Sequence, residues 1–81
     1  MLKTKIKVGH YYEFKLDDKN VIAFGVLYGF ERGKNKDVYT VMMYNHGKNF
    51  EFPIEEILFN KWVKEERIRE ISSDKVLTYA L

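Results

Sequence analysis

The chain has 81 residues, 46% of them hydrophobic and 16% aromatic, which indicates one small folded domain covering 1–81 and excludes a disordered protein. Its 14 basic and 12 acidic side chains give a net charge of +2, too balanced to indicate nucleic-acid binding by itself. The absence of cysteine excludes disulfides and thiolate metal sites. No apolar run is long enough to span a membrane, and residues 1–8 lack the apolar core of a signal peptide, so we expect a cytoplasmic protein.

The first predicted strand covers residues 4–16. Every second residue from Ile6 to Leu16 is apolar or aromatic except His10, while lysines and Glu13 occupy alternate positions. This period of two predicts a half-buried strand, bent at Gly9. Residues 17–20, Asp-Asp-Lys-Asn, are typical of a turn and predict an antiparallel hairpin with the next strand.

The second predicted strand, residues 21–30, alternates by size. Its even positions are all large, namely Ile22, Phe24, Val26, Tyr28 and Phe30, and its odd positions are mostly small. Because side chains alternate between the faces of a strand, one face carries bulk and the other lets another backbone approach closely. This pattern predicts a sharply bent strand, as in the wall of a small barrel.

A charged loop at 31–37 separates this strand from a third one at 38–44. The connection at 45–49 contains Gly47 and predicts a tight turn, after which residues 50–55 alternate as a fourth strand. Pro53 is expected to end the regular pairing of this strand, because proline has no backbone N–H to donate.

Residues 54–71 allow two interpretations. Pro53 and the acidic residues after it favour one helix through this segment. The alternative is a short helical turn at 54–59 followed by a charged strand at 64–71. Residues 72–74 break the pattern, and 76–81 predict a last strand.

The predicted fold is mainly β (α+β): about five antiparallel strands with one helical element before the last strand. In a chain this short, that order resembles an SH3-like or related small barrel, or a coiled meander. The resemblance is one of architecture only.

No catalytic constellation is present in the sequence. His10 and His46 are 36 positions apart, and the only serines, Ser72 and Ser73, have no neighbouring base. Acidic residues that are adjacent in sequence diverge on a strand or helix, so they do not form an acid–base pair. We therefore predict a non-enzymatic protein with no metal and no cofactor.

The aromatic residues predict a protein-binding role. Tyr11, Tyr39 and Phe59 fall on faces opposite the main apolar sets, and Trp62 lies beside Val63. Partly exposed aromatics dominate protein interfaces, so we expect a contact with another protein or with a second copy in a homodimer. The alternative is that both faces of the sheet are simply covered.

Nucleic-acid binding is the second functional hypothesis. It would use the basic loop residues Arg32, Lys34 and Lys36, extended by Lys3, Lys5 and Lys7, with nearby aromatic rings for stacking. The composition also suits an accessory or inhibitor protein of a bacterial phage or other mobile element.

Overall fold

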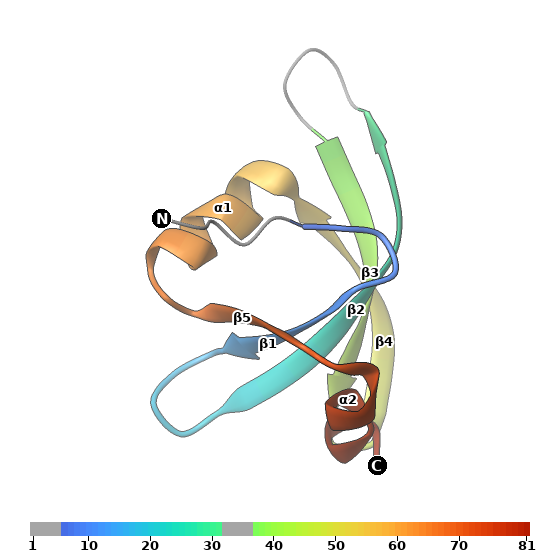
Figure 1. The fold of residues 1–81 in the computed structure, drawn as a ribbon, viewed down its shortest axis with the longest axis vertical. Helices are drawn as coiled ribbons and strands as arrows, with labels where there is room; N and C mark the ends of the chain where they lie inside the picture. Colours follow the sequence, from blue (N-terminus) through green and yellow to red (C-terminus); the bar gives the residue numbers. More distant parts are fainter. Residues whose placement is uncertain (1–5, 32–36) are drawn as a thin grey trace.

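The computed structural model describes residues 6–31 and 37–81, which form one coiled antiparallel sheet and two helices (Figure 1). The elements in chain order are β1 (Tyr11–Lys15), β2 (Val21–Glu31), β3 (Asp37–Asn45), β4 (Lys48–Glu55), α1 (Glu56–Lys64), β5 (Ile68–Ile71) and α2 (Ser73–Ala80). The strand order is β4-β3-β2-β1-β5. This confirms the mainly β meander with a helix before the last strand. In the described residues β4 and β5 are edges and do not pair, so the barrel is not closed.

The predicted hairpin between the first two strands is confirmed. β1 and β2 pair in the register Tyr12↔Phe24, and the Oδ1 atom of Asp17 accepts hydrogen bonds from the N–H groups of Lys19 and Asn20 at 2.8 and 2.9 Å. The bend predicted at Gly9 is confirmed by its φ of +86°, and because the chain turns there the strand begins only at Tyr11 within the described residues. Residues 4 and 5, where the predicted strand begins, lie outside the described residues.

A bulge in β2 changes the predicted alternation. Val26 pairs with Val41 and Tyr28 pairs with Thr40, so Leu27 is an extra residue. Before the bulge the even residues of β2 are buried, but after it Tyr28 is 54% exposed. The prediction that Tyr28 shares the face of Val26 is therefore wrong, because one extra residue reverses which face each later side chain takes.

The tight turn between β3 and β4 is confirmed at His46 and Gly47, whose φ values are both positive at 50° and 93°. The prediction that Pro53 ends regular pairing is wrong, since Pro53 stays in register opposite Thr40 and β4 continues to Glu55. An edge strand tolerates proline because only one side of its backbone pairs within the sheet.

The single helix favoured for 54–71 is wrong in its second half. α1 ends at Lys64, Glu66 takes a φ of +60°, and β5 follows, which is nearer to the alternative of a helical segment and a strand. The predicted last strand at 76–81 is also wrong, because this segment belongs to α2. The Ser72 hydroxyl caps that helix by accepting a hydrogen bond from the Lys75 N–H at 3.3 Å.

The two helices cover opposite faces of the sheet. On the core face, Phe59 of α1 makes edge contacts with the rings of Tyr12 and Phe24 at centroid distances of 5.2 and 6.3 Å. On the other face, Val76 of α2 and Ala23 of β2 are both buried. The sheet therefore has a main core under α1 and a smaller buried region under α2.

Candidate interaction surfaces

Two of the four aromatic residues predicted for protein binding belong to the packing around α1. Phe59 has no exposed surface, so its prediction as a contact residue is corrected: it is a core residue. Trp62 is partly buried, and its ring stacks on Phe14 with centroids 4.2 Å apart. A role of Trp62 in partner binding stays a prediction.

Tyr11 and Tyr39 lie on opposite faces of the sheet and are not brought together. Each is partly buried and pairs in register with a glycine of β2, Tyr11 with Gly25 and Tyr39 with Gly29. In both cases the tyrosine ring occupies the space that a side chain on the glycine would need. The prediction that another backbone approaches the small positions of β2 is therefore corrected: at Gly25 and Gly29 the space is filled by aromatic rings.

Most of the predicted basic patch falls outside the described residues. This applies to Lys3, Lys5, Arg32, Lys34 and Lys36. Lys7 is described and exposed, and its backbone N–H donates a hydrogen bond to the Tyr12 hydroxyl at 3.0 Å. Nucleic-acid binding through these residues stays a prediction.

The structure reveals an apolar surface at the β4 edge that sequence reasoning did not single out. Phe50 and Phe52 are 47% and 42% exposed, and their rings meet edge to face with centroids 6.5 Å apart. Their register partners on β3, Met43 and Val41, are both buried core residues. The apolar face of the sheet therefore extends beyond the buried core to the edge of the sheet formed by β4. We call Phe50 and Phe52 the β4 shelf.

The other face of β4 carries acidic side chains. Glu51 and Glu55 alternate with the shelf residues and are exposed. Within the described residues neither carboxylate has an ion pair. The edge strand therefore presents aromatic rings on one face and negative charge on the other. The sequence did contain a signal for an edge, since proline within a strand is typical of one.

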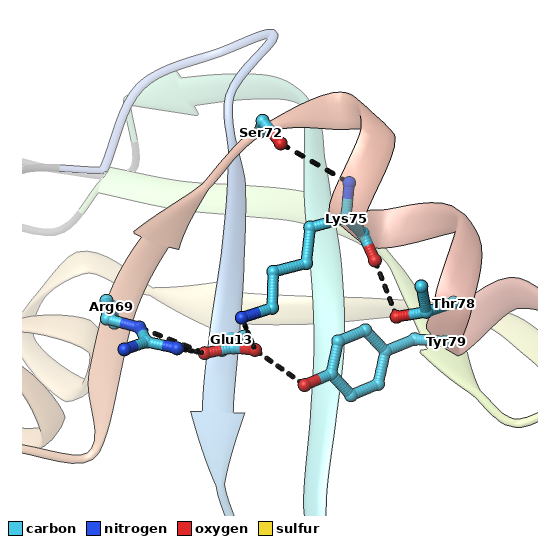
Figure 2. A network of polar contacts seen from close by, with 6 residues as sticks. All are labelled: Glu13, Arg69, Ser72, Lys75, Thr78 and Tyr79. Carbon is cyan, nitrogen blue, oxygen red and sulfur yellow. Dashed lines mark hydrogen bonds and ion pairs between the residues drawn. The ribbon is translucent and has the colours of Figure 1, made fainter.

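A polar cluster centred on Glu13 joins β1, β5 and α2 (Figure 2). Glu13 is 8% exposed. Its Oε1 atom accepts from Nε and Nη2 of Arg69 at 3.0 and 2.6 Å. Its Oε2 atom accepts from the Tyr79 hydroxyl at 2.6 Å and lies 3.4 Å from Nζ of Lys75. The carboxylate is thus almost enclosed by partners, and the cluster fixes α2 to the sheet.

The protonation of this cluster follows from its contacts. Burial alone would raise the pKa of the Glu13 carboxyl, but hydrogen bonds from Tyr79, Arg69 and Lys75 outweigh it and lower that pKa below its ordinary value. Burial, followed by the hydrogen bond to Glu13, raises the pKa of Tyr79 to about 12. Glu13 is therefore ionised and Tyr79 protonated near neutral pH, a state suited to a structural ion pair.

The two histidines do not share a site. Nδ1 of His10 lies 2.7 Å from a carboxylate oxygen of Glu70 on β5, whereas the ring of His46 lies beside Tyr79 of α2 at a centroid distance of 5.9 Å. Within residues 6–31 and 37–81, no group of three or more histidine or acidic side chains is placed to hold a metal ion.

Comparisons with known proteins add no family to this geometry. No protein-family model, curated protein or solved structure matches the chain. Among the described residues, no helix has the length and apolar character needed to cross a membrane.

Proposed function

We propose that this domain is a non-enzymatic binding protein that captures another protein at the β4 shelf. The observation that carries the proposal is the exposure of Phe50 and Phe52 directly beside buried Met43 and Val41. Aromatic rings bury large apolar areas and dominate interface energetics, so a partner that covers this shelf gains hydrophobic stabilisation. Contiguous apolar surface of this kind marks interaction sites on folded domains.

Two other groups considered above are excluded as contact sites by their packing. Glu13 is enclosed by its partners and Phe59 is inaccessible, so neither offers a surface to another molecule. An accessory or inhibitor role for a phage or mobile element would suit such a binding protein and stays a prediction.

A capture experiment with matched variants tests the proposal. Immobilised wild-type protein is compared with F50S/F52S, and the control is V8S/L77S, because Val8 and Leu77 are also exposed apolar residues but lie outside β4. We expect one partner protein to be retained on the immobilised wild type and on V8S/L77S, and not to be retained on F50S/F52S. Thermal unfolding verifies that all three proteins are folded. Equal retention by F50S/F52S, or no specific retention by the wild type, would contradict the proposal.

A further inference from the structure

We propose that the β4 shelf binds an extended peptide segment that adds to β4 as a further strand and alternates apolar residues with lysine or arginine. This inference rests on the proposed function and specifies the chemistry of the partner. Three properties of β4 carry it: the outer side of its backbone, which has no partner among the described residues, the division of its side chains between two faces, and its anchored start.

The backbone of β4 has one side available for pairing. In the described part of the chain, β3 is its only hydrogen-bonded neighbour in the sheet. The outer side of an edge strand presents N–H and C=O groups, which are a template for an added strand. Pro53 interrupts this row because it has no N–H, so the continuous template runs over residues 48–52.

The side chains of β4 define what the added strand must carry. Residues opposite each other in a sheet share a face, so residues beside Phe50 and Phe52 meet aromatic rings and are required to be apolar. Residues on the other face meet the carboxylate of Glu51 within the template, and Glu55 extends this acidic face beyond Pro53; neither carboxylate has an ion pair among the described residues. Opposite charges across neighbouring strands attract, so this face selects lysine or arginine.

The start of β4 is held in place before any partner arrives. The backbone N–H of His46, in the turn before β4, donates to the carbonyl oxygen of Tyr79 in α2 at 2.8 Å. Tyr79 is itself held to the sheet by its hydrogen bond to Glu13. A preformed edge loses little conformational freedom on binding, which favours capture of a flexible peptide.

Labelled peptides test the proposal through fluorescence anisotropy at physiological salt. The probes alternate valine with lysine, alternate valine with glutamate, or carry the valine and lysine residues in two separate blocks. We expect the alternating lysine peptide to bind at least about tenfold more tightly than the other two, about 1.4 kcal/mol. N-methylation of alternate peptide nitrogens should abolish binding if its backbone pairs with β4.

A charge-reversed variant separates recognition from general folding effects. E51K/E55K should reverse the preference, so that the alternating glutamate peptide binds more tightly than the lysine peptide. The control D18K changes an exposed charge in the β1–β2 turn and should keep the wild-type preference. A gain of binding in E51K/E55K cannot come from misfolding.

The other outcomes overturn the inference. It is wrong if no alternating peptide binds, or if the preference is the same in E51K/E55K and the wild type. If a partner is captured through Phe50 and Phe52 but no alternating peptide binds, the inference fails and the proposed function stands. Sedimentation that shows a dimer lost in F50S/F52S would make the occupant a second copy, which also overturns the peptide inference.

Discussion

The ring of Tyr11 on β1 occupies the space beside Gly25, its register partner on β2: a Cβ on Gly25 would lie 2.7 Å from the Cε1 atom of Tyr11. Tyr39 on β3 has the same relationship to Gly29, where a Cβ would lie 2.5 Å from the ring. The bulge at Leu27 separates the two pairs and places them on opposite faces of β2. Aromatic rings that cover glycines shield the backbone and restore the packing that the missing side chains would supply.

Gly25→Ala should destabilise the domain by about 1–3 kcal/mol, because the added methyl displaces the Tyr11 ring. The control is the same substitution in a Tyr11→Ala background, where the ring is absent and the cost should be much smaller. Urea denaturation of the four proteins in this cycle gives the coupling free energy. An equal cost in both backgrounds would show that Gly25 is required for a reason other than the ring.

Glu13→Gln should lower the free energy of unfolding by about 1–3 kcal/mol at neutral pH. One carboxylate oxygen becomes an NH2 group, which cannot accept a hydrogen bond from Arg69 or Tyr79. Chemical denaturation measures this change. Glu51→Gln is the control, since Glu51 is exposed and has no ion pair among the described residues.

The same substitution should reduce the sensitivity of the protein to acid. The pKa of Glu13 is lowered in the folded state, so the unfolded state binds the proton more tightly. The stabilisation from ionised Glu13 is complete above the ordinary carboxyl pKa of 4.5 and is lost as the pH falls through the lower folded value. Unfolding free energies across this acid range should therefore fall more steeply for the wild type than for Glu13→Gln. Equal slopes would contradict this assignment.

Phe59→Ala should cost about 3–5 kcal/mol, because the substitution leaves a cavity between α1 and the rings of Tyr12 and Phe24. Ile57→Ala on the same helix should change stability by less than about 0.5 kcal/mol, since Ile57 is 66% exposed. Thermal and urea unfolding of both variants distinguish a core residue from a surface residue. A Phe59→Ala protein as stable as the wild type would contradict the packing described here.

Ser72→Ala should destabilise the protein by about 1 kcal/mol, because the Lys75 N–H at the start of α2 loses its acceptor. Ser73→Ala is the matched control, since the adjacent Ser73 is the first residue of the helix rather than its cap. Hydrogen exchange of the α2 amides should be faster in Ser72→Ala than in Ser73→Ala. Equal exchange in the two variants would show that the cap does not stabilise the helix.

The parts of the fold that depend on local chemistry were predictable from the sequence. Turns at 17–20 and 45–49 follow from residues that bond their own backbone or accept a positive φ, and both hairpins formed as expected. The strand predicted for 76–81 is wrong because the β-branched and aromatic residues of this segment are typical of a strand. The feature that indicates a helix, the Ser72 cap, lies outside the segment. A serine followed by Asp74 in the first turn was a helix signal in the sequence.

The candidate site depends on contacts that the sequence pattern does not contain. Alternation placed Phe50 and Phe52 on an apolar face, but their exposure depends on where α1 covers the sheet. Glu13 alternated as a solvent-facing residue, and its burial depends on Tyr79 of α2, 66 residues later. Leucine is not a residue type that indicates a β-bulge. The sequence therefore did not predict that Tyr28 lies on the opposite face from Val26.

The two strands that pair with β1 lie at very different distances from it along the sequence. β2 begins after a short turn, whereas Arg69 of β5 is 56 residues from Glu13. While a ribosome is still synthesising β5, one backbone edge of β1 and the carboxylate of Glu13 lack their native partners. Such long-range pairing is slow relative to hairpin closure. We therefore expect the hairpins to form early on the nascent chain, and β5 and α2 to dock against β1 only after they have emerged from the ribosome.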